Sequence, residues 1–143
     1  MNRSTKENPK VRLINSILFY AYLLLISILS LLPSDSMPDI PLFPNADKLI
    51  HMAMYAGFTF LLLNAWKGYF IDRNKWLIPV LIALWGIGME SLQSLKSIGR
   101  SFDLWDEAAN IAGFFPGWLA VVVFQKYKKR FRSKNQNQQT SEV

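Results

Sequence analysis

Four apolar segments, separated by polar stretches, follow one another along the chain. The first, residues 13–32, is a run of 20 residues without a charged side chain. At a rise of about 1.5 Å per residue, a helix of this length spans roughly the 30 Å hydrocarbon core of a bilayer. Three further apolar segments occupy residues 49–66, 76–95 and 106–124. The pattern predicts an all-α fold, an integral membrane four-helix bundle, and excludes the folds of soluble enzymes.

The first segment also resembles a signal peptide, because four basic residues precede it within the arm at residues 1–12. Its apolar run is longer than the roughly 7 to 15 residues of a signal-peptide core, however. The residues that follow, Leu31-Leu32-Pro33-Ser34-Asp35, lack a small-residue cleavage pattern. We therefore expect this segment to be retained as the first helix.

Basic residues between the segments predict the orientation, because lysine and arginine resist translocation. The arm at 1–12, the loop at 67–75 and the tail at 125–143 together hold 13 of the 16 basic residues. Lys48, Lys96 and Arg100 are the other three. This division predicts that both termini are cytoplasmic, in the bacterial cytoplasmic (inner) membrane, and that the loops after the first and third helices face outward.

Composition narrows the possible partners. The formal net charge is +6, but the basic residues flank the helices as topology signals require, so we expect the bilayer and its anionic lipids as partners and no nucleic acid. Cysteine is absent, which excludes a disulfide framework and thiolate metal sites. The basic, polar tail at 125–143, which has a Gln/Asn-rich end, is expected to be disordered.

Local signals refine three of the helices. Asn45 is positioned to cap the second helix, and Asp103 the fourth. The uncharged run at 76–89 is too short to cross a bilayer, so the third helix must continue to Leu95. In the fourth, Pro116 predicts a kink near Ala112. The same helix carries a ridge of small residues, which lets helices approach closely: Ala109, Gly113 and Gly117.

Polar residues gather at the outer end of three helices, at spacings that place them on one face of each. Ionisable residues at membrane depth are costly, and they usually face the bundle interior and pair with one another. We therefore predict one outward-facing pocket, with His51, Glu90 and Asp106 as candidate catalytic residues. Its expected members are Asp47, Lys48, His51, Tyr55, Glu90, Gln93, Arg100, Asp103, Asp106 and Asn110.

Each of these residues also has a structural explanation. The aspartates are acids at helix N-termini, where the helix dipole favours them. His51 is equally suited to bonding a neighbouring helix. Arg100 either neutralises Asp103 or Asp106, or offers a fork to phosphate or carboxylate. Glu90 is the hardest to explain structurally, because a carboxylate about four residues inside a membrane helix needs a partner or a proton.

Three polar blocks carry a family resemblance: the run from Asp47 to His51 with Tyr55, the run from Glu90 to Gln93, and the run from Arg100 to Asp106 with Asn110 and Gly113. In this order they resemble the VanZ-like family of small bacterial membrane proteins, over about half of the chain. The name-giving member is associated with teicoplanin resistance. The resemblance therefore implies a fold and a role at the cell envelope, without implying a particular reaction.

Several functions remain open from the sequence. The first is an accessory or binding role, with the pocket holding a lipid headgroup, a lipid-linked envelope precursor or a glycopeptide. The second is a membrane enzyme acting on a lipid-linked or phosphate-containing substrate, since His51, carboxylates and Arg100 suffice for metal-assisted or acid/base chemistry. The third is a purely structural network between helices. The cofactor, the metal content and the oligomeric state are not determined by the sequence.

Overall fold

The computed structural model describes residues 8–32, 44–66, 76–94 and 103–141, with the side chains of residues 132 and 134–141 excepted. Its elements are α1 (Pro9–Leu31), α2 (Ala46–Ala65), α4 (Leu77–Gln93), α5 (Leu104–Ala112) and α6 (Phe114–Ser141). No strand occurs among these residues. The prediction of an all-α chain is confirmed.

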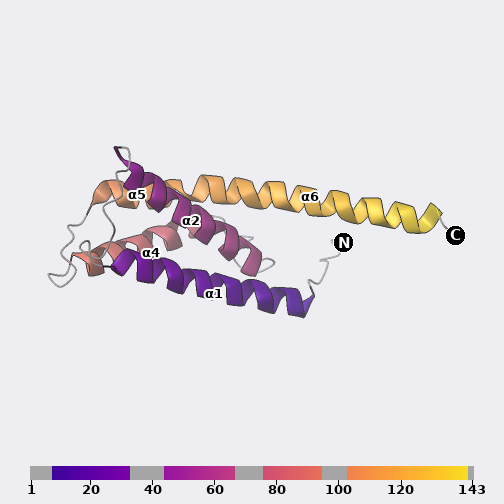
Figure 1. Ribbon diagram of the computed structural model, residues 1–143, viewed down its shortest axis with the longest axis horizontal. Coiled ribbons are helices and arrows are strands. Elements are labelled where there is room, and N and C mark those ends of the chain that lie inside the picture. The colour runs from indigo at the N-terminus through magenta and orange to yellow at the C-terminus, as the bar shows by residue number, and fades with distance from the viewer. Residues whose placement is uncertain (1–7, 33–43, 67–75, 95–102, 142–143) are drawn as a thin grey trace.

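The helices run alternately in opposite directions (Figure 1). The C-terminal ends of α1 and α4 lie at the same end of the molecule as the N-terminal ends of α2 and α5. α2 is the central helix, because its contacts with α6, α1 and α5 are the most extensive between the described helices. The core between the helices is apolar, with Ile78 and Ile82 of α4 among its most buried side chains.

In the part of the chain that the structure describes, two helical stretches are long and apolar enough to cross a membrane, Pro9–Leu31 and Leu104–Phe131, and α4 is a shorter apolar helix. Their apolar side chains are largely exposed within the molecule. Leu24, Leu84 and Phe115 are 62%, 65% and 66% exposed. Contiguous exposed apolar surface of this kind is typical of contact with lipid or a partner.

Helix starts differ from the expected ones for local reasons. α1 begins at Pro9, four residues early, because the Asn8 side chain accepts a hydrogen bond from the Lys10 backbone N–H and proline suits the first helical position. Asp103 caps α5 as predicted, with its Oδ1 accepting from the Trp105 N–H at 2.8 Å. Asn45 precedes α2, but the predicted side-chain cap is wrong: Asn45 makes no capping hydrogen bond and has a φ of 64°.

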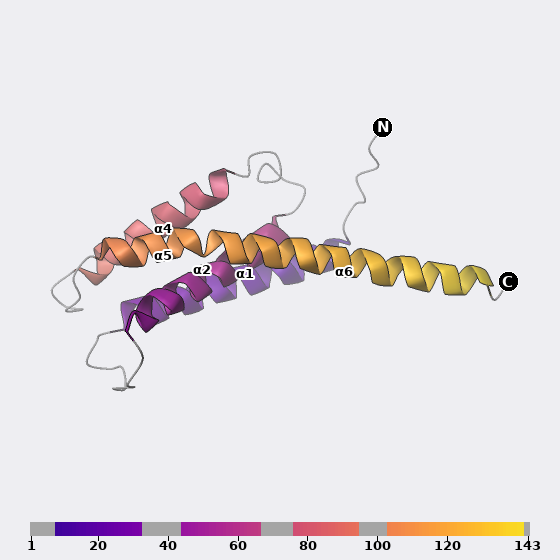
Figure 2. The same cartoon turned by 90° about the horizontal axis from the view of Figure 1, so that it is seen from above.

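The tail differs from its expectation too. Instead of an irregular tail from residue 125, α6 continues to Ser141 (Figure 2). Lysine, arginine and glutamine are good helix formers, and a helix already formed by the preceding apolar residues extends without a new nucleation cost. The boundary between α5 and α6 falls at Gly113, the residue after Ala112, where a kink was expected.

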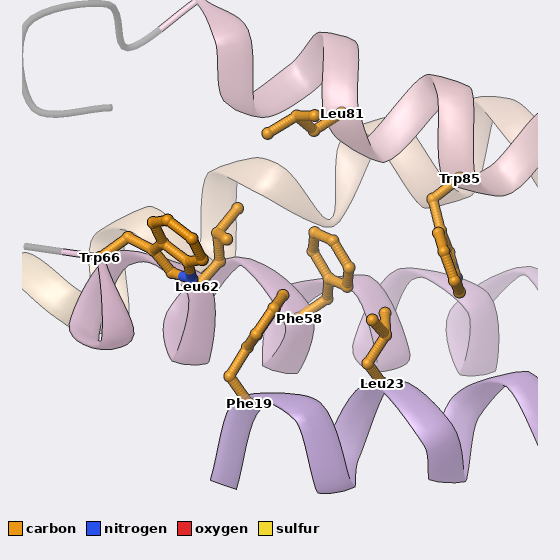
Figure 3. Close-up of a pocket in the computed structure, with 7 residues that line it drawn as sticks. All are labelled: Phe19, Leu23, Phe58, Leu62, Trp66, Leu81 and Trp85. Carbon is orange, nitrogen blue, oxygen red and sulfur yellow. The ribbon is translucent and has the colours of Figure 1, made fainter. Parts of the chain in front are cut away.

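An apolar pocket of about 290 Å³ lies between α1, α2 and α4, and its lining residues are all apolar or aromatic (Figure 3). Phe19 and Leu23 of α1 face Phe58 of α2 across it, and Trp85 of α4 closes one side. It therefore differs from the outward-facing polar pocket predicted from the sequence.

Candidate functional site

Polar side chains meet where the first turns of α2 and α5 approach the last turns of α4. Asp47, Lys48 and His51 come from α2, Glu90 from α4, and Asp106 and Asn110 from α5. Asp103 lies directly before α5. The spacing of four along α2 and of three and four along α5 directs these side chains to the same place.

Lys48 is the centre of an ion-pair network. Its Nζ lies 2.7 Å from Asp47 Oδ2, 2.6 Å from Asp103 Oδ2 and 2.6 Å from Asp106 Oδ1. The Lys48 side chain is 24% exposed, so the network sits at the edge of the buried region. Lys48 contacts Asp103 and Asp106, and so fills one of the two roles considered for Arg100, that of neutralising them. Arg100 itself lies outside the described residues.

The electrostatics of this network favour its charged forms. Hydrogen bonds from Lys48 and from the Trp105 backbone N–H hold the pKa of Asp103 below its usual range. A hydrogen bond from Lys48 likewise lowers the pKa of Asp47. The pKa of Lys48 is raised in turn by its hydrogen bonds to the three aspartates. The shifts of Lys48, Asp47 and Asp103 therefore all favour the charged form of the group concerned.

A hydrogen-bond chain leads inward from His51. Its Nδ1 lies 2.9 Å from Asn110 Oδ1, and Asn110 Nδ2 donates to Glu107 Oε2 at 3.2 Å. The other ring nitrogen of His51, Nε2, faces Asp106 Oδ2 at 3.6 Å. Asn110 is only 1% exposed and Glu107 only 7%. The two ends of the imidazole are thus held differently, one by the amide and the other facing a carboxylate.

Glu90 is almost completely enclosed, with 1% of the residue exposed. Its Oε2 accepts a hydrogen bond from the Asp103 backbone N–H at 3.3 Å, which joins α4 to the start of α5. One ligand atom from each of Glu90, His51 and Asp106 lies within 4.8 Å of the others. The three candidate residues named from the sequence therefore come together, from three different helices.

The other predicted members lie at the edges of this cluster. Tyr55 is buried on α2, with its ring next to Phe58. Gln93 is buried as well, but its side chain donates to the Ser30 backbone carbonyl at 2.7 Å and so ties α4 to α1. The exposed Asp47 belongs to the Lys48 network.

Glu107 is the residue that the sequence analysis did not place in the pocket. It lies three residues before Asn110 and four after Asp103, so helical spacing alone could have included it. Its carboxylate packs where a side chain on Gly86 would be, since a Cβ there would collide with Oε2. Its Oε1 is buried without a hydrogen-bond partner among the described residues.

Within the described residues, two sets of side chains have the geometry to hold a cation. One is His51, Glu90 and Asp106, and the other is Asp47, Asp103 and Asp106. The ammonium group of Lys48 already fills the second set. The first set combines one imidazole with two carboxylates, which are ligands for divalent metals as well as groups for acid/base chemistry.

The site thus offers a charged rim around Lys48 and a more buried group of His51, Glu90 and Asp106. Comparisons with protein-family models, curated proteins and solved structures found no match to this chain.

Proposed function

We propose that the chain is a VanZ-like, multi-pass protein of the bacterial cytoplasmic membrane, with four spans and both termini in the cytoplasm. The alternating directions of α1, α2, α4 and the α5–α6 pair support this proposal (Figure 1). The 13 to 3 division of basic residues supports it independently. In this arrangement the cluster at the start of α2 and α5 faces the outside of the cell.

We propose further that this cluster has an accessory or binding role at the cell envelope and lowers susceptibility to teicoplanin-type glycopeptides. Its ligand is a lipid headgroup, a lipid-linked envelope precursor or the glycopeptide itself. One observation carries the proposal: Glu90, 1% exposed, lies beside Asp106 and His51. Bringing two carboxylates together at low exposure is unfavourable, and a structural network would not require it.

The second candidate is a membrane enzyme acting on a lipid-linked or phosphate-containing envelope substrate. The hydrogen-bond chain from His51 through Asn110 to Glu107 favours it, because it orients the imidazole as a catalytic histidine needs to be oriented. His51, Glu90 and Asp106 would then carry acid/base chemistry. Product formation from a lipid-linked precursor by the purified protein separates this candidate from a binding role.

The topology is tested with fusions of a reporter that is active only outside the cytoplasm. A fusion after Val143 is expected to be inactive, and the same reporter inserted within residues 33–43 is expected to be active. Equal activity at both positions contradicts a cytoplasmic C-terminus, and with it an outward-facing cluster.

The binding role is tested by pairing two measurements on Glu90→Gln and His51→Ala. Glu90→Gln keeps the size of the side chain and an oxygen that can accept from the Asp103 N–H, so the melting temperature in detergent should stay near that of the wild type. Protection of cells against a lipoglycopeptide should fall to the level of cells that lack the protein.

Ser91→Ala is the matched control, because Ser91 is exposed and adjacent to Glu90, and its hydroxyl donates within its own helix, to the Ile87 carbonyl oxygen. It should keep both stability and protection. Loss of stability in step with loss of protection would favour the structural network. Normal stability with unchanged protection would remove both residues from the function.

A further inference from the structure

The buried half of the cluster has more negative charge than the contacts around it balance. Glu90 and Asp106 approach each other beside His51, with ligand atoms of all three within 4.8 Å. Lys48 bonds Asp106 through Oδ1, which leaves Oδ2 facing His51. The contact made by Glu90 within the described chain is a neutral one, from the Asp103 backbone N–H. Two carboxylates in this setting require a cation or a proton.

The contacts of His51 fit a bound cation. Asn110 donates through Nδ2 to the Glu107 carboxylate, so its Oδ1 is the atom turned toward His51. A carbonyl oxygen only accepts hydrogen bonds, so Nδ1 of His51 carries the hydrogen. In the neutral ring Nε2 then presents a lone pair to Asp106 and Glu90. Metal-bound histidines are held in this way, with the far nitrogen donating to an oxygen.

The distance between His51 Nε2 and Asp106 Oδ2 also agrees with a metal ion bound by both residues. His51 Nε2 and Asp106 Oδ2 are 3.6 Å apart, which is too long for a hydrogen bond. Two ligand atoms bound to one tetrahedral Zn²⁺ at about 2.0 to 2.2 Å lie about 3.3 to 3.6 Å from each other. Glu90 supplies the third atom of the set, in which one ligand atom from each of the three residues lies within 4.8 Å of the others.

We infer that His51 Nε2 and one carboxylate oxygen from each of Glu90 and Asp106 bind a divalent metal ion, with Zn²⁺ the best match to this ligand set. One imidazole and two carboxylates suit zinc chemistry, and three protein ligands leave a fourth position for water or for an anionic oxygen of a ligand. Asn110 and Glu107 act as positioning residues behind His51. The inference concerns the cluster of the proposed function and rests on that function for its biological setting.

The test uses the full chain, purified in detergent and stripped of bound metal with a chelator. Zn²⁺ is titrated into this protein, and the heat of binding is measured by calorimetry. One saturable site per chain is expected, together with a rise in melting temperature on adding Zn²⁺. His51→Ala and Glu90→Gln should each weaken binding at least about 100-fold, and Asn110→Ala about 10- to 100-fold, as for other outer partners of a metal-bound histidine. Ser91→Ala is the control and should bind as the wild type does.

The absence of saturable binding up to millimolar Zn²⁺ would overturn the inference, as would equal binding by wild type, His51→Ala and Glu90→Gln. If His51→Ala does not fold, the nearly isosteric Glu90→Gln carries the test. Failure here is distinguishable from failure of the proposed function. If the protein binds zinc but gives no protection against glycopeptides, the metal site stands and the proposed function is wrong. If the protein gives protection but binds no zinc, the proposed function stands and the metal site is wrong.

Discussion

Gly117→Ala is expected to destabilise the protein by about 1 to 3 kcal/mol, the usual cost of adding a methyl group to a packed interior. A Cβ at Gly117 would collide with the Ala56 backbone carbonyl and lie 2.7 Å from Thr59 Cβ. Gly113→Ala should behave similarly, because its Cβ would lie 2.6 Å from the Met52 carbonyl oxygen and 2.9 Å from the Ala56 backbone nitrogen. Backbone atoms cannot rotate away, so the α5–α6 stretch must move off α2.

Gly88→Ala is the control, because a Cβ at Gly88 meets nothing within 4 Å. Alanine in place of glycine in a helix should stabilise the protein by about 0.8 to 1 kcal/mol. The measurement is the melting temperature of each variant in the same detergent. If all three substitutions raise it, the small residues make no close contact and the arrangement of α2 against α6 is wrong.

This close contact was predictable, because the ridge of Ala109, Gly113 and Gly117 is visible in the sequence as small residues every fourth position. The apolar segments predicted the helices for a similar reason: their length and lack of charge leave helix as the structure that satisfies the backbone. That two stretches are long and apolar enough to cross a membrane follows from the same composition. The four-span topology remains a prediction.

The partners of the polar residues were harder to predict. Spacing places a residue on a face of its helix, but which residue it meets depends on the rotation and depth of the neighbouring helix. Gln93 illustrates this, because it shares a face with Glu90 and yet bonds the Ser30 carbonyl of α1. Glu107 enters the cluster because Gly86 leaves room for it on α4. Helical spacing could have placed Glu107 on the correct face of α5, but its contact with Gly86, like that of Gln93 with Ser30, has no local sequence signal.

Lys48 was assigned to the pocket from the sequence, but its role as the shared partner of three aspartates required the structure. Because Lys48 contacts all three aspartates, its loss should reduce stability more than the loss of any one aspartate. Lys48→Met retains most of the volume and removes the charge, and leaves Asp47, Asp103 and Asp106 to repel one another. We expect the melting temperature in detergent to fall by roughly 5 °C, between the small effect of an exposed ion pair and the large effect of a buried one.

The matched control is Lys126→Met, because Lys126 is exposed on α6 and forms no ion pair with the residues that the structure describes. It should change the melting temperature by much less. Adding Asp103→Asn to Lys48→Met should restore part of the loss, since the substitution removes one of the repelling charges, whereas Asp103→Asn alone should destabilise. A double mutant whose loss equals the sum of the two single losses would show that the residues act independently. The charged network at the start of α2 and α5 would then make no measurable contribution as a unit.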